Sequence, residues 1–209
     1  LAPEEPAEPS VDPEHTIKAM CDRLIDKGAS RAVIVSPEGD EAAASSVLIA
    51  REMADRGLRS ILLDLTQTGA ASHPMVDGLA LPGITNLLAS QAQFADIIQN
   101  DPYSNAHVIP NGTADAQTAM KAVERLPIIL NALTTAYDVV IVECGPADAK
   151  GIGRLVTPGA EIIISVIDPA DASIVKCAAA LQDAGYEDLL IVTPVGSVPP
   201  APQPTRRVA

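Results

Sequence analysis

Short runs of aliphatic and β-branched residues alternate with longer helical stretches along most of this chain, and this alternation restricts its fold more than any other feature. Runs of this kind, bounded by turn signals, are typical of strands buried on both faces of a parallel sheet. Successive strands and helices imply right-handed crossovers, so the sequence predicts an α/β fold with a mostly parallel sheet and helices on both faces. The predicted strands are RAVIVS (31–36), SILLDL (60–65), a short one at 106–109, YDVVIVE (137–143), EIIISVI (161–167) and DLLIVT (188–193).

The stretches between these runs have helical character. We expect helices over about 15–27, 43–56, 115–136 and 170–184, the first two ending near Gly28 and Gly57, where a C′ glycine is favoured. Aromatic residues make up only 2% of the chain, so the core must be built from Val, Ile, Leu and Ala. In a parallel sheet, ligands sit at the carboxyl ends of the strands. The loops after Ser36, Leu65 and Glu143 are therefore the places to look for a site.

Charge and cysteine content exclude several classes of function. Lys and Arg number 14 against 27 Asp and Glu, a net charge of −13, and no basic run could follow a nucleic-acid backbone. No apolar stretch approaches the ~20 residues of a membrane-spanning helix. Three widely spaced cysteines favour a reducing cytoplasm rather than a disulfide framework or a zinc site.

The two ends differ in composition from the middle. Residues 1–13 form a Pro/Glu-rich linker, residues 14–194 one α/β domain, and residues 195–209 a Pro-rich tail, as judged from composition. The chain opens on Leu1 without a signal-peptide pattern, so we expect a piece of a longer protein, whose missing part could include a membrane segment.

Four segments together carry a resemblance to a known family. They are VSPEGDEAAASSVLIAREMADRGLRSILLDL (35–65), PGITNLLA (82–89), VIPNGTA (108–114) and YDVVIVECGPAD (137–148). In this order and spacing they resemble the cytoplasmic domain of the bacterial tyrosine kinase and polysaccharide co-polymerase family, relatives of the MinD/ParA ATPases. The resemblance implies a P-loop NTPase-like (Rossmann-like) fold and a role in exopolysaccharide biosynthesis, export or chain-length control.

The phosphate loop departs from the family pattern. Members carry a loop of the type PGEGKST, in which backbone amides, a Lys and a hydroxyl hold ATP and Mg²⁺. Gly39 keeps one glycine, whereas the second Gly, the Lys and the two hydroxyl residues are replaced, in order, by Glu41, Ala42, Ala43 and Ala44. Ser45 and Ser46 lie one or two residues further on, so a shift of register would restore a hydroxyl but not the Lys.

The same loop is acidic. Glu38, Asp40 and Glu41 place three carboxylates where a triphosphate would lie. Each like-charged pair at ~4 Å costs about 1 kcal/mol in water and about 4 at a partly shielded surface, so phosphate should be repelled. We interpret the loop as an acidic surface turn before a helix. A calcium site is the less favoured alternative, because it needs about six oxygen ligands.

The other motif positions also depart. Asp64 is kept, Thr66 replaces a second Asp, and Glu143 replaces a later Asp. Glu143 either holds a metal through water or is a strand-end acid facing solvent. Cys144 is either a reactive thiol at the strand edge or an inert buried Cys. The tail lacks the tyrosine cluster of active members, since Tyr103, Tyr137 and Tyr186 all lie inside the folded region.

These losses predict a non-catalytic domain with no catalytic residue, no metal and no cofactor. Partners are expected to be further copies of the chain or other polysaccharide-assembly proteins. The domain is expected on the cytoplasmic side of the bacterial inner membrane. Its attachment to the membrane would come only from a segment of the parent protein that is missing from this sequence. Two alternatives stay open: a divergent tyrosine kinase or ATPase that binds ATP and Mg²⁺ through Asp64, Glu143 and Ser45 or Ser46, and a soluble MinD/ParA-like partner protein.

Overall fold

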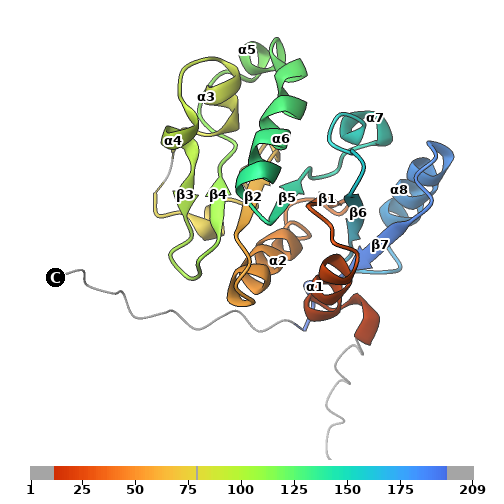
Figure 1. Ribbon diagram of the computed structural model, residues 1–209. Coiled ribbons are helices and arrows are strands. Elements are labelled where there is room, and N and C mark those ends of the chain that lie inside the picture. Colours follow the sequence, from red (N-terminus) through yellow and green to blue (C-terminus); the bar gives the residue numbers. More distant parts are fainter. Residues whose placement is uncertain (1–11, 79, 197–209) are drawn as a thin grey trace, which may run out of the picture.

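The computed structural model describes residues 12–78 and 80–196. Its strands form one sheet in the order β3-β4-β2-β5-β1-β6-β7 (Figure 1). Among the described strands only β3 runs antiparallel to its neighbour. The predicted mostly parallel α/β fold is therefore confirmed. The strands are β1 (Arg31–Val35), β2 (Ser60–Asp64), β3 (Gln99–Asn100), β4 (His107–Ile109), β5 (Val139–Glu143), β6 (Ala160–Ser165) and β7 (Leu189–Val192).

Helices cover both faces of the sheet. One face packs against α1 (Ile17–Asp26) and α2 (Ala44–Asp55), and the other against the remaining α-helices. In β1, for example, Ala32 and Ile34 point to the first face and Val33 and Val35 to the second, so neither face of the strand is polar. The remaining helices are α3 (Ile84–Leu88), α4 (Phe94–Ile97), α5 (Ala116–Met120), α6 (Leu126–Ala136), α7 (Ala149–Ile152) and α8 (Ala172–Asp183), with short 3-10 helices η1 (Pro13–His15), η2 (His73–Met75) and η3 (Val123–Arg125).

The long helix predicted over 115–136 is wrong in one respect. The segment is broken into α5, η3 and α6, and Pro127 lies in the first turn of α6. Proline lacks an N–H and its ring clashes with the preceding turn, so it is tolerated at the start of a helix but not inside one. The short elements β3, α3, α4 and α7 were not predicted either.

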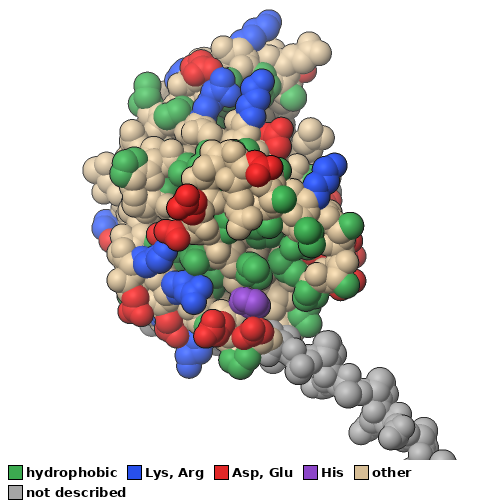
Figure 2. Space-filling view, turned by 90° about the vertical axis from the view of Figure 1, so that its right-hand side faces the viewer, with side chains coloured by type: hydrophobic (Ala, Val, Ile, Leu, Met, Phe, Trp, Pro, Cys, Tyr) green, Lys and Arg blue, Asp and Glu red, His purple; other side chains and the backbone are tan. Residues whose placement is uncertain are grey.

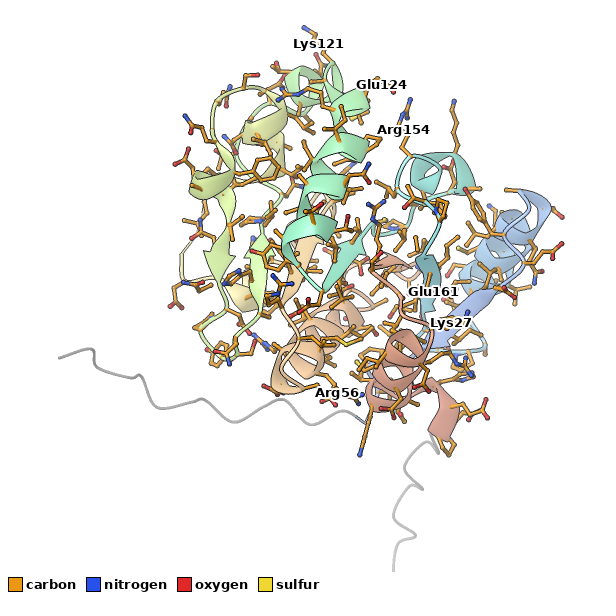
Figure 3. The ribbon with its side chains drawn as sticks, viewed as in Figure 1. Lys27, Arg56, Lys121, Glu124, Arg154 and Glu161 are labelled. Carbon is orange, nitrogen blue, oxygen red and sulfur yellow. The ribbon has the colours of Figure 1, made fainter. Side chains whose placement is uncertain are left out.

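Ion pairs join neighbouring elements at the surface. Lys27 Nζ lies 2.7 Å from a carboxylate oxygen of Glu161, and Arg154 pairs with Glu124 at 2.8 Å (Figure 3). On the face that Figure 2 shows, acidic and basic side chains are interspersed and no basic band forms. Within residues 12–78 and 80–196, no helix has both the length and the apolar character needed to cross a bilayer.

The two ends of the described body meet. The Thr193 amide donates a hydrogen bond of 2.9 Å to the carbonyl of His15, which places the end of β7 beside η1 (Figure 1). The predicted linker and tail lie outside the described residues, apart from Asp12, Pro13, Val195 and Gly196. The domain limits therefore stay a prediction.

Candidate functional site

The motif segments singled out in the sequence meet at the carboxyl ends of β1, β2 and β5. The loop 36–46 follows β1 directly, while Asp64 and Glu143 are the last residues of β2 and β5 and lie opposite each other in the parallel register. Asp64, Thr66 and Glu143 are all buried. The sheet thus brings together the positions that carry nucleotide chemistry in the resembling family.

The backbone of the loop is closed on itself. Gly39, in the left-handed region at φ +91°, begins a series of turns. The amides of Ala42 to Ser46 each donate to the carbonyl oxygen three residues earlier, at 3.1 to 3.3 Å. A phosphate-binding loop needs such amides free to point at the anion. In this chain they are already used.

The alanines at the family's Lys and hydroxyl positions belong partly to the core. Ala42 and Ala43 are completely buried, whereas Ala44 is exposed. The Ser165 hydroxyl lies 2.7 Å from both the Ala42 carbonyl oxygen and the Ser45 hydroxyl. A small side chain at these positions lets the start of α2 pack directly onto the end of β6.

Two of the three loop carboxylates bind neighbouring loops. Glu38 accepts hydrogen bonds from the amides of Ile167 and Asp168, at 2.6 and 2.9 Å, and Asp40 accepts one from the Thr68 hydroxyl at 2.9 Å. We call these the two carboxylate bridges. Glu41 is exposed. The interpretation as a simple solvated acidic turn therefore holds for Glu41 but not for Glu38, which is half-buried and bound to backbone.

Glu143 does not face solvent, so that prediction is wrong. The side chain is fully buried beneath α2, where it accepts hydrogen bonds from the Ser46 hydroxyl and from the Gly145 amide at 2.8 Å. The pKa of Glu143 is raised from 4.5 to about 7, chiefly by burial and to a small extent by the nearby Asp64 carboxylate, while the hydrogen bonds to the carboxylate oppose the shift. The Ser36 hydroxyl is buried close by and also lowers this pKa, although it makes no hydrogen bond of normal geometry with any described residue.

Asp64 has a structural set of partners. It accepts hydrogen bonds from the Thr66 amide at 2.9 Å, the Thr66 hydroxyl at 2.7 Å and the Ser72 amide at 2.7 Å. The Thr66 hydroxyl in turn accepts from the Ala70 amide at 3.0 Å. The carboxylate thus organises the loop after β2, and Thr66, which replaces an acid of the family, is part of the same network.

Cys144 and metal chemistry add little to the site. Burial, together with the Glu143 carboxylate, raises the pKa of the Cys144 thiol well above its usual range, so the thiol stays protonated at neutral pH. In the part of the chain that the structure describes, no group of three or more His, Cys, Asp or Glu side chains could hold a metal ion.

Asn86 has a role in the site that was not predicted from the sequence. Its amide oxygen accepts hydrogen bonds from the amides of Gly83, at 3.0 Å, and Thr113, at 2.8 Å. It therefore joins two of the segments that carry the family resemblance, 82–89 and 108–114. The available signal was an Asn among the apolar residues Ile84, Leu87 and Leu88, because a polar group buried among such residues needs partners.

The topology and the position of the loop define the class: a P-loop NTPase-like α/β domain. No protein-family model and no curated protein matches the sequence. Several solved structures are similar to this chain. The BceF tyrosine kinase domain is 24% identical, with a TM-score of 0.66 over 85% of this chain and 73% of that one.

Two other kinase structures have similar folds. The VpsO kinase domain has a TM-score of 0.71 at 20% identity, and the match covers 84% of this chain and 90% of that one. The kinase domain of the Escherichia coli tyrosine kinase ETK has a TM-score of 0.68 at 16% identity, and the match covers 88% of this chain and 76% of that one. MinD from Pyrococcus furiosus has a TM-score of 0.51 at 19% identity, over 78% and 69% of the two chains. The resemblance found in the sequence is confirmed at the level of the fold.

Proposed function

We propose that this chain is a non-catalytic P-loop-like domain of a polysaccharide co-polymerase. It takes part in exopolysaccharide biosynthesis, export or chain-length control by binding further copies of itself or other assembly proteins. Its place is the cytoplasmic side of the bacterial inner membrane, and its phosphate loop does not hold Mg·ATP.

The observation that carries this proposal is the closed loop over β1. Its amides from Ala42 to Ser46 are bonded within the loop, and the Ser46 hydroxyl is bonded to Glu143. No Lys or Arg lies between Ser36 and Ser46 to offset the charge of a triphosphate. Binding of Mg·ATP would require breaking several internal hydrogen bonds without a cation to compensate.

The kept architecture supports a role in assembly rather than chemistry. The chain has the fold of bacterial tyrosine kinase domains, and the strand ends, the crossover helices and the Asn86 junction are all well packed. Selection for a surface alone would keep these features while allowing the loop to lose its Lys.

The test is calorimetric titration of the chain with Mg·ATP and with Mg·ADP. A fitting positive control is the cobyrinic acid a,c-diamide synthase from Mycobacterium smegmatis, a fold neighbour solved with an ATP analogue and magnesium. We expect heat of binding for the control and none for this chain up to about 1 mM nucleotide. A dissociation constant of 1 mM corresponds to a binding free energy of about −4 kcal/mol, so any binding to this chain should be weaker than that. Micromolar binding would overturn the proposal.

The competing function is a divergent ATP-dependent tyrosine kinase or ATPase. It is favoured by one observation, the pairing of Asp64 with Glu143 at the carboxyl edge, where two acids could serve a metal. Incubation of the full-length protein with radiolabelled ATP separates the functions. A labelled tyrosine supports the kinase and released labelled phosphate supports the ATPase, whereas the non-catalytic domain gives neither.

A further inference from the structure

A cavity of about 460 Å³ opens at the amino ends of the strands. It therefore lies at the end of the sheet opposite to the loop 36–46, which follows the carboxyl end of β1. Its floor is formed by the first residues of β2 and β4, Ser60 and His107, and its walls by α4 and the last turn of α6. Its volume is within the range of small-molecule sites, which run from about 300 to 1,000 Å³.

The walls of the cavity are apolar. Phe94 and Ile98 form one side, and Ala132, Leu133 and Ala136 of α6 form the other. The helix α6 contains no charged residue, although a fifth of the chain is charged. A ligand that fits between these walls must therefore present mainly apolar surface, and a flat ring suits two facing walls of this kind.

The polar lining residues are Asn105, the pair His107 and Tyr137, and Ser60, whose hydroxyl is used in a hydrogen bond of 2.8 Å to the Ala50 carbonyl oxygen. The Tyr137 hydroxyl and Nδ1 of His107 lie 2.7 Å apart, with the two rings nearly perpendicular at 82°. If the hydroxyl donates, Nε2 keeps the proton and the phenol oxygen can still accept; in the other tautomer these roles are exchanged. In both cases the pair offers one donor and one acceptor.

The charge at the rim is already neutralised. Arg59 also lines the cavity, but its guanidinium donates to both carboxylate oxygens of Asp138, at 2.6 and 3.2 Å. No other charged residue is among the described lining residues. An anionic or cationic ligand would therefore find no free counter-charge, and a neutral one is favoured.

We propose that this cavity binds a small neutral aromatic molecule that carries one hydroxyl group. The ring lies between Phe94 and α6, and the hydroxyl meets both the donor and the acceptor of the His107–Tyr137 pair. A hydroxyl is the smallest group that satisfies both partners at once. This site is separate from the loop after β1, so it does not depend on whether nucleotide binds there.

Phe94 makes a direct test possible because it is the only phenylalanine in the chain. Protein labelled with [¹³C]phenylalanine gives a single aromatic spin system that reports on the cavity. We use 4-methylphenol as the probe and toluene as its match without the hydroxyl. We expect a saturable shift of the Phe94 signals with 4-methylphenol and about 30-fold weaker binding of toluene, the effect of two neutral hydrogen bonds.

Three variants complete the test. In Tyr137→Phe, the preference for 4-methylphenol over toluene should fall to about fivefold, because His107 keeps only one hydrogen bond to the hydroxyl. Ala136→Phe fills the cavity and should abolish binding of both probes, whereas Thr135→Phe, on the same helix but outside the lining, should leave binding unchanged. Thermal unfolding checks that each variant is folded.

The proposal is overturned if Phe94 does not respond to 4-methylphenol up to about 10 mM. It is also overturned if the two probes bind the unmodified chain equally well, because the polar pair would then play no part. If Ala136→Phe does not fold, the Tyr137→Phe comparison still decides between these results.

Discussion

The Ser46 hydroxyl donates a hydrogen bond to the Glu143 carboxylate across the gap between α2 and the end of β5. This contact ties the first turn of the helix to the sheet at the point where a nucleotide-binding domain of this fold keeps its chemistry. The Gly145 amide completes the set of donors to Glu143. Because both of these donors are already used by Glu143, they have little to offer a ligand.

Replacing Glu143 by Gln should change how stability depends on pH. The folded state holds the pKa at about 7 against 4.5 for the free group, so the folded protein binds the proton more tightly. The stability of the unmodified chain should therefore fall as pH rises from 4.5 to about 7, and Glu143→Gln removes that loss, worth about 3 kcal/mol above pH 7. Urea unfolding at a series of pH values measures the difference between the two proteins.

The matched control for this pH experiment is Glu41→Gln, an exposed carboxylate of the degenerate loop. Its difference from the unmodified chain should stay within about 0.5 kcal/mol at every pH. A Glu143→Gln difference that does not grow between pH 4.5 and 7 would contradict the raised pKa.

Restoring the missing lysine should damage the fold rather than restore nucleotide binding. Ala42 is completely buried, so Ala42→Lys forces a charged chain into the packing between α2 and β6 and should cost about 3 kcal/mol or more. Ala44 is exposed, and Ala44→Lys should change stability by no more than about 0.5 kcal/mol. Urea unfolding compares the two, and a gain of Mg·ATP binding in Ala42→Lys would show that the loop can reopen.

The Glu38 bridge should hold the loop after β6 in place. Glu38→Ala removes the acceptor for the amides of Ile167 and Asp168 and should destabilise the chain by about 2 kcal/mol. Hydrogen exchange at those two amides should become faster. Glu41→Ala, in the same loop, serves as the control, and equal effects of the two variants would rule out the bridge as a stabilising contact.

A side chain at Gly83 should disrupt the junction between the two resembling segments. A Cβ at Gly83 would contact the Pro110 carbonyl oxygen and lie 2.6 Å from the Gly112 amide nitrogen, both of them backbone. Gly83→Ala should therefore cost about 2 to 3 kcal/mol, measured by thermal or urea unfolding. Gly153→Ala is the comparison, since its Cβ would make ordinary contacts at 3.5 Å and beyond. Similar melting temperatures for the two variants would argue against the close approach.

Much of the fold could be predicted because its strands have a strong local signal. The runs at 31–36, 60–65 and 137–143 are rich in aliphatic residues, and the strands in them are buried along their whole length, as a doubly covered parallel sheet requires. The break before α6 was harder to see, because the residues around Pro127 are good helix formers on either side and only the proline marks the boundary.

The site could be predicted in position but not in its contacts. Spacing placed Asp64 and Glu143 at one edge, which the register confirms. The partners of Glu38 lie about 130 positions away in the chain, at Ile167 and Asp168, and no local pattern announces such a contact. The same holds for Glu143, whose burial depends on how α2 docks and not on its neighbours in sequence.

The hydrogen bond from Thr193 to His15 has a consequence for how the domain can be joined to other polypeptides. Because the polypeptide enters and leaves the folded body at one point, the body can be inserted into a surface loop of a host protein without separating the two halves of that loop. For the same reason, a short peptide joining the two ends should permit circular permutation, with new termini cut at an exposed turn.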